Sequence, residues 1–595
     1  MDLTPPPAPV PLVSVPPVPA AGNDIDRRIR AGLGRATGSL SAGTALLSAW
    51  DWGINLLVSP GKQMELALLA LDYAGQVARY DIECMLAGPG ETRRHVKPPA
   101  RDRRFEGPAW LHWPFNVLHQ SFLLYEQWWD AATHGVLGVD RKHEERVAFA
   151  ARQLLDLTSP GNNLLTNPVA MQRTFAEGGQ NLVRGAQNFI TDMQRLAAGL
   201  PPPGAEKFVV GRNVAATPGK VVLKNRLMEL IQYSPATTKV CPEPVLLVPA
   251  WIMKYYILDL SPANSLVKYL LDQGHTVFCI SWKNPTAEER DLSMDDYVNL
   301  GLRAALDAVT AIVPERKVHA LGYCLGGTLL ALGAAAMARD GDDRLASLTL
   351  LAAQTDFTEP GELGLFIDES QVSLLEAQMA QTGYLTSGQM AGAFQLLRSN
   401  DLLWSRLINH YLLGEPAPVN DLMAWNADAT RLPARMHSEY LRQLFLHDDL
   451  AQNRYKVEGR LVALADIKVP VFLLGTLTDH VAPWRSVYKL HCLAPAEITF
   501  VLTSGGHNAG IVSPPGHRHR RYQLLTTPAF TGQVQDVRID PDRWLADAPR
   551  SEGSWWPAWH EWLRARSGAP AKPPRMGLPG AGRLDDAPGR YVLEK

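Results

Sequence analysis

The chain has 595 residues, of which 46% are apolar and 20% are charged, and its formal net charge at pH 7 is −2. One hydrophobic core rarely serves a chain of this length, so two or more domains are expected. The near-neutral charge gives no reason to expect nucleic acid or a strongly anionic membrane as a partner. The five cysteines are widely spaced without a CxxC pair, which argues against disulfides and a metal site and favours a reducing cytosol.

The first part of the chain divides into two segments. Residues 1–24 are rich in proline and lack the basic start of a signal peptide, which predicts a disordered arm. No apolar run has the length of a transmembrane helix, so we expect a cytoplasmic protein. From residue 25 to 207, apolar residues recur at helical spacing, which predicts an N-terminal helical domain. The aromatic-rich stretch 108–132 is either its core or an apolar face for a partner or product.

Residues 208–570 show a different pattern, in which short apolar runs alternate with helical segments. After a hairpin-like stretch at 204–225, six runs are typical of buried parallel strands. They cover 244–251, 275–282, 317–324, 345–357, 469–479 and 497–507. The alternation lapses at about 358–466, where a mostly helical insertion is well placed to form a lid or cap. We therefore predict an α/β catalytic domain with a lid, followed by a C-terminal tail at 571–595.

The third of these runs, 317–324, ends in a candidate nucleophile. Gly322-Tyr323-Cys324-Leu325-Gly326 matches the G-x-S-x-G elbow of α/β-hydrolases, with cysteine in place of serine. The glycines permit a sharp strand-to-helix turn that exposes the nucleophile above the sheet. Cys279, inside an apolar strand, is the better candidate for an inert core thiol.

An acid and a base follow in the chain order expected for this fold. Asp479 comes just after one predicted strand and His507 just after the next. His507 would take the proton of Cys324, and Asp479 would orient the imidazole. Asp356, after an earlier strand, is an alternative acid. His480 is expected to have a structural role.

Two further features depend on the loops around this site. His517 and His519 belong to a basic loop that is expected to be solvated, or to meet a phosphate-bearing leaving group. An oxyanion hole needs two backbone N–H donors. Leu325 would supply one, and a residue near Trp251 or Ile252, after the strand 244–251, would supply the other.

Sulfur at the nucleophile position favours a particular substrate class. Attack of a thiolate on an oxygen ester would give a less stable thioester, whereas attack on a thioester exchanges one C–S bond for another. A cysteine nucleophile thus suits an acyl-CoA and keeps the acyl group activated for transfer. The site predicts an acyltransferase.

Seven stretches form a specific set of motifs: GYCLGGT, YYILDLSP, ISWKNP, WNADATRLP, TDHVAPW, SGGHNAGIVSPP and GSWWPAWHEWL. Together they resemble the polyhydroxyalkanoate synthases over nearly the whole chain from about Asp102 onward. With its own N-terminal helical region, the chain is similar to the single-subunit classes I and II. Family members commonly have asparagine where this chain has Met253, which predicts a local change of pocket shape.

The resemblance implies an α/β-hydrolase fold with a polymerase triad of Cys324, Asp479 and His507. The substrate would be a 3-hydroxyacyl-CoA, with (R)-3-hydroxybutyryl-CoA expected, and the products polyester and CoA. It also implies a homodimer at the surface of cytoplasmic polymer granules, without metal or cofactor. Trp425 and its surroundings match a region associated with substrate access and dimer contacts.

Two other hypotheses stay open at this point. A cysteine-nucleophile hydrolase, either an acyl-CoA thioesterase or a polyester depolymerase, would share the triad and release free acid. A non-catalytic protein of the granule surface would use the aromatic-rich stretch and leave Cys324 unreactive toward acyl-CoA.

Overall fold

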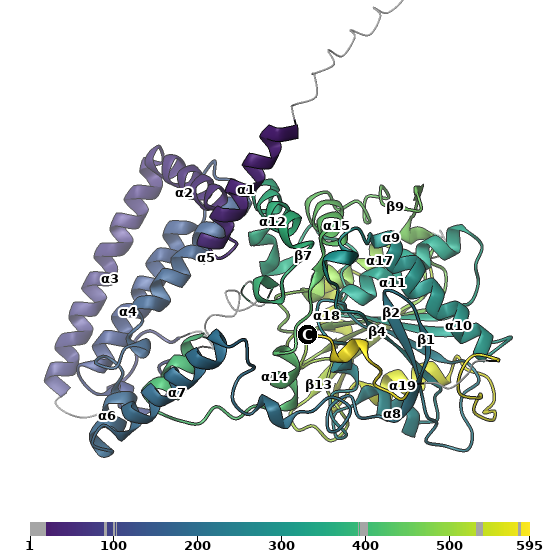
Figure 1. Ribbon diagram of the computed structural model, residues 1–595. Coiled ribbons are helices and arrows are strands. Elements are labelled where there is room, and N and C mark those ends of the chain that lie inside the picture. The colour runs from purple at the N-terminus through teal and green to yellow at the C-terminus, as the bar shows by residue number, and fades with distance from the viewer. Residues whose placement is uncertain are drawn as a thin grey trace, which may run out of the picture.

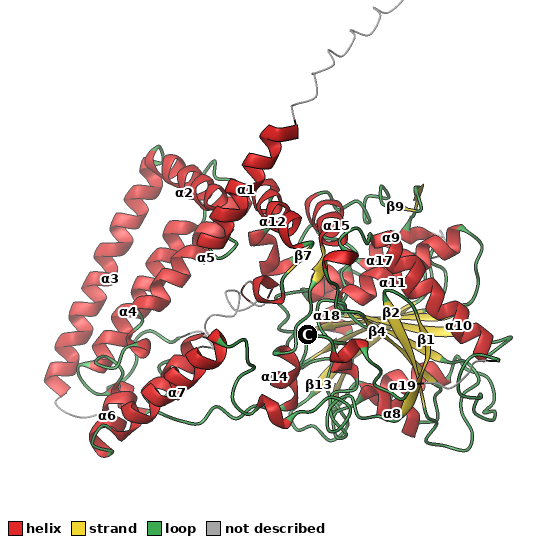
Figure 2. Cartoon of the chain, viewed as in Figure 1, coloured by secondary structure: helices red, strands yellow, loops and turns green. Residues whose placement is uncertain are grey.

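The structure is a computed structural model that describes residues 20–87, 92–98, 102, 104–390, 392, 403–530, 539–580 and 585–595. A helical N-terminal part lies beside a larger part built on one twisted sheet (Figures 1 and 2). Of the proline-rich arm predicted for 1–24, residues 1–19 lie outside the described residues, and the first helix begins at Ala20.

The predicted N-terminal helical region is confirmed. Its principal helices are α1 (Ala20–Ala36), α2 (Ala42–Leu57), α3 (Pro60–Ala87), α4 (Phe115–Thr133), α5 (Arg141–Thr158), α6 (Pro168–Ala176) and α7 (Gln180–Ala197). The aromatic-rich stretch is partly buried and partly exposed. Trp110 and Phe122 pack with Phe105 in a small separate core, whereas Trp113 and Tyr125 are at least half exposed.

A ten-stranded mixed sheet forms the core of the larger part, which confirms the predicted α/β-hydrolase fold. Its order is β1-β2-β4-β3-β5-β6-β11-β12-β13-β14. All six predicted strands are its central parallel strands: β4 (Val277–Trp282), β3 (Val245–Val248), β5 (Val318–Tyr323), β6 (Leu345–Leu351), β11 (Val471–Thr476) and β12 (Ile498–Thr503). Because their carboxyl ends meet at one edge, residues that follow them converge there.

Antiparallel strands extend the sheet on both sides. They are β1 (Gly219–Lys224), β2 (Met228–Tyr233), β13 (Arg521–Thr527) and β14 (Arg550–Glu552). The hairpin-like stretch predicted at 204–225 contains only β1, whose partner β2 follows it in the chain. Helices cover both faces, with α10 (Ala304–Ile312) and α11 (Leu325–Arg339) on one and α8 (Leu266–Asp272) and α19 (Trp556–Arg564) on the other (Figure 1).

The helical insertion lies between β6 and β11, where the lid was predicted. Its elements are η7 (Gly361–Phe366), α12 (Glu369–Thr382), β7 (Tyr384–Leu385), η9 (Leu407–Leu412), α14 (Asp421–Asn426), β8 (Leu432–Pro433), α15 (Ala434–Glu439), η10 (Tyr440–Leu446), β9 (Lys456–Val457), β10 (Arg460–Leu461) and η11 (Leu464–Asp466). It contacts the N-terminal helices: a Cβ on Gly185 of α7 would lie 1.8 Å from Tyr411 O of η9. Only glycine permits this approach.

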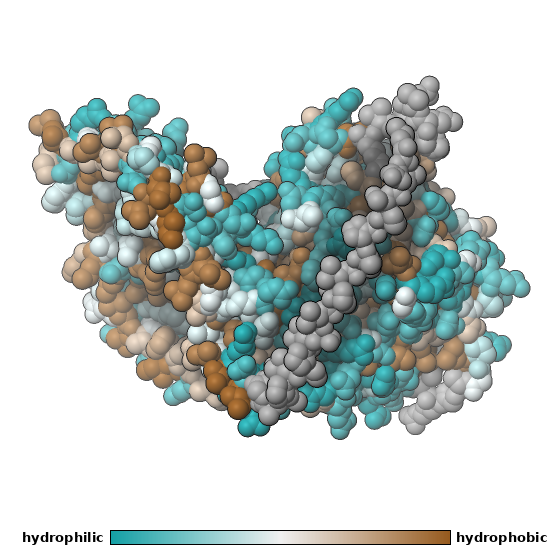
Figure 3. Space-filling view, turned by 90° about the horizontal axis from the view of Figure 1, so that it is seen from above, coloured by the Kyte–Doolittle hydropathy of each residue, from teal (hydrophilic) through white to brown (hydrophobic). Residues whose placement is uncertain are grey.

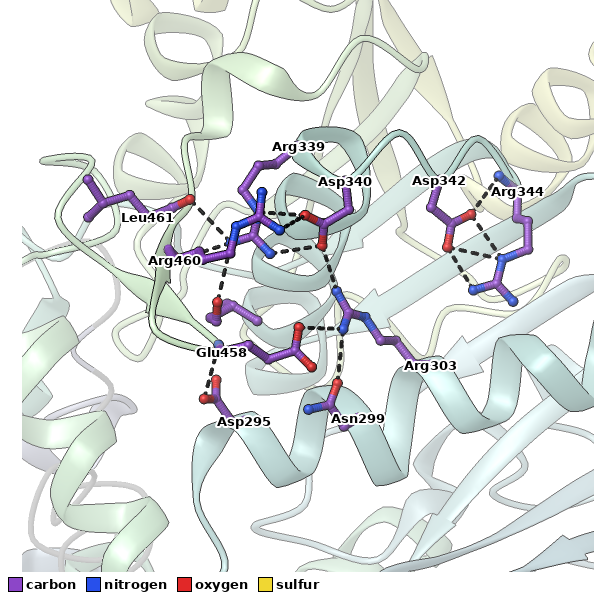
Figure 4. A network of polar contacts seen from close by, with 11 residues as sticks. Asp295, Asn299, Arg303, Arg339, Asp340, Asp342, Arg344, Glu458, Arg460 and Leu461 are labelled. Carbon is purple, nitrogen blue, oxygen red and sulfur yellow. Dashed lines mark hydrogen bonds and ion pairs between the residues drawn. The ribbon is translucent and has the colours of Figure 1, made fainter.

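A network of ion pairs connects the β9–β10 hairpin to α11, the helix that follows the elbow (Figure 4). Asp340 caps the C-terminal end of α11 and pairs with Arg303 at 3.1 Å and Arg460 at 2.7 Å. Arg303 also binds Glu458 at 2.8 Å. A hydrogen bond from Arg339 is the main reason that the pKa of Asp340 is lowered to about 2. The insertion is thereby attached to α11, which begins next to Cys324.

The C-terminal region is built onto the sheet. Four buried tryptophans donate their indole N–H groups to the sheet and its loops. Trp555 donates to Gly510 O and Trp556 to Ile511 O, while Trp559 donates to Thr349 Oγ1 and Trp562 to Thr499 Oγ1. Two of these acceptors lie just after His507, so α19 supports the loop that carries this residue. Residues 585–595, part of the predicted tail, lie along β1 and β2, where Glu229 accepts hydrogen bonds from Arg590 N and Tyr591 N.

Candidate active site

Cys324 occupies the turn between β5 and α11, as the elbow motif predicts. Its backbone has φ 54° and ψ −124°, a left-handed conformation that is strained for a residue with a side chain. The turn leaves no room for larger neighbours, because a Cβ on Gly322 would lie 2.4 Å from Gly327 Cα. A Cβ on Gly326 would lie 2.0 Å from Val248 O. These glycines therefore let the elbow press against the ends of β3 and β5.

His507 and Asp479 come together beside this turn. His507 Nδ1 lies 2.8 Å from Asp479 Oδ2, and the His507 side chain is close enough to Cys324 for the two to interact electrostatically. Asp479 is held in place from its other side, because Oδ1 accepts the backbone N–H groups of Val481 and Ala482, each at 2.9 Å. The structure thus brings together the three side chains that the sequence predicts as nucleophile, base and orienting acid.

The electrostatics of this chain favour a charged histidine next to a carboxylate. Burial alone would raise the pKa of Asp479, but the His507 charge and hydrogen bond outweigh it and lower the pKa. Burial alone would lower the pKa of His507, but the charges of Asp479 and of a Cys324 thiolate raise it well above its ordinary value. The arrangement can therefore hold an imidazolium after proton transfer from the thiol.

The alternative residues are placed differently. The Asp356 carboxylate binds Thr358 and the Lys489 ammonium, 3.2 Å away, instead of His507. His480 accepts a hydrogen bond at its backbone carbonyl from Glu362 N. His517 and His519 are exposed on their loop, and Cys279 is fully buried in β4, where burial raises the pKa of its thiol.

The predicted oxyanion donors, Leu325 and Ile252, both line the same cavity as Cys324. Leu325 is the first residue of α11, a position whose N–H has no acceptor within its helix. The loop that holds Ile252 is fixed by Thr430, which donates its hydroxyl to Trp251 O at 2.6 Å and its N–H to Ile252 O at 3.3 Å. The insertion thus sets the position of this loop.

Trp425, predicted at the substrate entrance, is buried and donates its indole N–H to Lys254 O at 2.7 Å. Lys254 is buried as well, and its ammonium donates to Glu594 O at 2.6 Å and Tyr591 O at 3.3 Å. Burial lowers the pKa of Lys254 to about 8. Met253 pairs with Ala429 in an isolated bridge. The loop 251–254 is therefore clamped between the insertion and the C-terminus.

A mostly apolar cavity of about 230 Å³ opens over Cys324. Sequence reasoning missed two of its contributors. His437 of α15 is buried there, burial lowers its pKa to about 4, and its Nδ1 has no hydrogen-bond partner among the residues that the structure describes. The turn Gly38–Leu40 reaches the cavity from the N-terminal part, and no local pattern near residue 40 indicates this contact.

Comparisons with known proteins show the family to which the chain belongs. Residues 101–270 match the family model "Poly-beta-hydroxybutyrate polymerase (PhaC) N-terminus", and residues 20–62 match "Poly-beta-hydroxybutyrate polymerase N terminal". Residues 243–514 match the alpha/beta hydrolase fold. The chain is 41% identical to the poly(3-hydroxyalkanoate) polymerase of Methylorubrum extorquens over 84% of its own length and 82% of that protein. The chain belongs to the poly(3-hydroxyalkanoate) polymerase family.

Other members of the family are similar over comparable lengths. The chain is 38% identical to the PhaC polymerase subunit of Rhizobium meliloti, covering 84% of this chain and 81% of that one. It is 37% identical to the PhaC subunit of Cupriavidus necator, covering 87% of each. Family membership makes this chain an enzyme of the acyltransferase class.

In the part of the chain that the structure describes, no group of three His, Cys, Asp or Glu side chains is arranged to hold a metal ion. Among the same residues, no helix combines the length and apolar character needed to cross a membrane.

Proposed function

We propose that this chain polymerises a 3-hydroxyacyl-CoA, with (R)-3-hydroxybutyryl-CoA the expected substrate, into a polyester through an acyl-Cys324 intermediate. The observation that carries the proposal is the convergence of Cys324, His507 and Asp479, with Cys324 lining an apolar cavity. A cysteine in this position suits a thioester substrate, because the exchange of thioesters is nearly thermoneutral.

The first step transfers the acyl group to the enzyme. His507 takes the proton of Cys324, and the thiolate attacks the thioester carbonyl. The N–H groups of Leu325 and Ile252 stabilise the oxyanion. The C–S bond to CoA then breaks, and the proton held by His507 passes to the departing CoA thiolate. One thioester is lost and one is formed, so no other reactant is needed.

The second step forms the polymer bond. The 3-hydroxyl of another unit attacks the acyl-Cys324 carbonyl while His507 takes the hydroxyl proton. An ester bond forms, the bond to Cys324 Sγ breaks, and the proton returns to the sulfur. Because a hydroxyl is far less acidic than a thiol, Asp479 matters more here than in the first step.

Water competes with the hydroxyl for the acyl-enzyme. Effective molarities of about 10⁵–10⁸ M for well-oriented groups are enough to outweigh bulk water, provided that the site positions the hydroxyl. The insertion between β6 and β11 covers Cys324 with apolar side chains such as Phe357, Phe366 and Leu441. We propose that it acts as a lid that favours polymer over free acid.

We further propose that the enzyme acts as a homodimer on cytoplasmic polymer granules. Exposed apolar side chains gather on the N-terminal helices, on the left of Figure 3. They include Leu46, Trp50, Leu57, Leu71 and Leu86, each more than two-thirds exposed. Apolar patches of this kind are typical of surfaces that bind another apolar surface.

Mass spectrometry of the acyl-enzyme tests the proposal. Brief incubation with 3-hydroxybutyryl-CoA should add the hydroxyacyl mass to the peptide that contains Cys324. Cys324→Ala should abolish the adduct and CoA release, while Cys279→Ala should retain both. Substantial CoA release by folded Cys324→Ala protein would refute the proposed nucleophile.

A further inference from the structure

The cavity over Cys324 has one wall that comes from a distant part of the chain. Gly38, Ser39 and Leu40, which connect α1 to α2, line it together with Cys324. Helix α1, which precedes this turn, packs against α12 of the insertion (Figure 1). The N-terminal region thus reaches the acyl site directly.

The conformation of this turn is specific. Gly38 and Ser39 both adopt left-handed backbone conformations, with φ 64° and 67°. Such a conformation is unfavourable for serine, which has a Cβ. Ser41 then caps the N-terminal end of α2, and its side chain accepts the N–H of Thr44. Contacts with other parts of the chain are therefore needed to stabilise this turn.

Gln371 of α12 supplies them with a single buried amide. Its Nε2 donates to Ser39 O at 2.6 Å, and its Oε1 accepts the N–H of Ser41 at 2.8 Å. Gln389 adds a hydrogen bond from Nε2 to Ser39 Oγ at 3.1 Å. Because both glutamines also line the cavity, the groups that hold the turn are part of the acyl site itself.

Contacts on either side of the turn keep it aligned with α12. Thr44 donates to Asp368 Oδ1 at 3.0 Å, and Ser41 Oγ lies 2.8 Å from Ser370 Oγ. A Cβ on Gly34 of α1 would lie 2.6 Å from Gln378 Nε2, so α1 approaches α12 closely. The position of Leu40 is therefore set by polar contacts along one face of α12.

The lining around Leu40 suits a hydrocarbon. Leu363, Phe366, Ile367 and Leu375 contribute to the same cavity. The alkyl side chain of a 3-hydroxyacyl group requires no hydrogen-bond partner, so it can occupy such a surface without leaving polar groups unpaired. The cavity begins at the atom that would carry the acyl group and extends to the turn.

We propose that the turn Gly38–Leu40, held by Gln371, is a wall of the acyl cavity that limits the side-chain length of the accepted 3-hydroxyacyl group. This role rests on the proposed function, because it assigns a specificity determinant to the same site. The N-terminal region would then select substrates as well as present an apolar surface.

Paired leucine substitutions test this wall in the full chain. Leu40→Ala enlarges the cavity, whereas Leu47→Ala makes the same change at an exposed position of α2. The ratio of kcat/KM for 3-hydroxyoctanoyl-CoA to that for 3-hydroxybutyryl-CoA should rise roughly tenfold in Leu40→Ala, since pocket volume of this order discriminates methylene groups by about 10–200-fold. It should stay unchanged in Leu47→Ala and fall in Leu40→Trp.

The size of the acyl cavity can also be tested by chemical labelling of Cys324, which does not require turnover. An alkyl methanethiosulfonate transfers its alkylthio group to the Cys324 thiolate, forming a disulfide and releasing methanesulfinate. The ratio of the octyl to the methyl labelling rate at Cys324, followed by peptide mass spectrometry, should rise in Leu40→Ala. Gln371→Leu, which removes both hydrogen bonds to the turn, should raise it as well.

The two measurements separate the two proposals. If wild-type protein releases no CoA from either substrate but the labelling ratio rises in Leu40→Ala, the proposed function fails and the wall stands. If turnover occurs but neither ratio changes in folded Leu40→Ala and Leu40→Trp proteins, the wall is refuted. Equal changes in Leu47→Ala would also refute it, because that side chain lies outside the cavity.

Discussion

His507 donates its Nδ1–H to Asp479 Oδ2 across 2.8 Å, which leaves Nε2 as the ring nitrogen available to Cys324. The carboxylate is fixed in turn by Thr476 Oγ1, at 3.0 Å, and by two backbone N–H groups. The His507 imidazole is therefore oriented by a carboxylate that is itself held by three hydrogen bonds. This arrangement gives the two residues separable roles.

Substitutions of the base and of the acid should affect different steps. His507→Ala should lower the rate of Cys324 acylation by about 10²–10⁴-fold, the usual contribution of a general base. Asp479→Asn should retain part of the acylation but slow elongation more strongly, since the less acidic hydroxyl depends more on an oriented base. Single-turnover labelling with radiolabelled acyl-CoA, followed by multiple-turnover assays, measures the two steps.

His517→Ala is the matched control, because His517 is exposed and its Nδ1 contacts only the neighbouring Arg518 carbonyl in the described contacts. It should behave as wild type. Equal loss of acylation in His507→Ala and Asp479→Asn, or a severe loss in Asp356→Asn alone, would mean that the roles are misassigned.

Trp425 should affect catalysis through the oxyanion loop. Trp425→Phe removes the donor to Lys254 O and leaves a buried carbonyl unpaired, at a cost of about 1–3 kcal/mol. The loop that carries Ile252 should loosen, which lowers kcat while KM changes little. Steady-state kinetics measure this split, with Trp113→Phe at an exposed N-terminal site as the control. A rise in KM with unchanged kcat would instead indicate a role in substrate entry.

The central strands and the elbow could be predicted because their causes are local. A fully buried parallel strand needs a short apolar run, and the elbow needs glycine on both sides of the nucleophile. β2 escaped prediction since it is buried but contains Glu229 and Gln232. Glu229 also pairs with nearby Lys224, but its other partners, Arg590 N and Tyr591 N, and the Gln232 partner Gly577 N lie more than 340 residues away.

The same reasoning explains what was missed at the site. Cys324, Asp479 and His507 each follow a predicted strand, so the topology alone brings them to one edge of the sheet. Leu40 lines the cavity because α1 packs against α12, and the spacing of apolar residues in the sequence does not indicate this packing. His437 is missed for a related reason, because its importance follows from burial and not from a motif.

Buried neutral histidines should make the fold sensitive to acid. Burial is the main reason that the pKa of His319 is lowered from 6.5 to about 4, and His119 and His437 show the same direction. Between pH 6.5 and about 4, such a histidine is protonated in the unfolded chain but stays neutral in the folded chain. The free energy of unfolding therefore falls as the pH drops from 6.5 toward 4. At pH 5 one such group accounts for at most about 2 kcal/mol.

Urea unfolding at pH 7 and pH 5 measures this effect. The wild-type midpoint should be lower at pH 5, and the difference should shrink in His319→Gln, which keeps polar atoms near Ser347 and Ser567. The exposed His517→Gln should leave the difference unchanged. A midpoint that rises on acidification would contradict the assignment of neutral buried imidazoles.

The most direct test of the account is the product that the intact enzyme makes from 3-hydroxybutyryl-CoA. CoA release is followed with a thiol reagent, and the acyl product is examined by NMR. The account predicts that CoA release is matched by insoluble material with ester-linked 3-hydroxybutyrate units. Release of CoA and soluble 3-hydroxybutyrate in equal amounts, without an ester-linked product, would contradict it and favour a thioesterase.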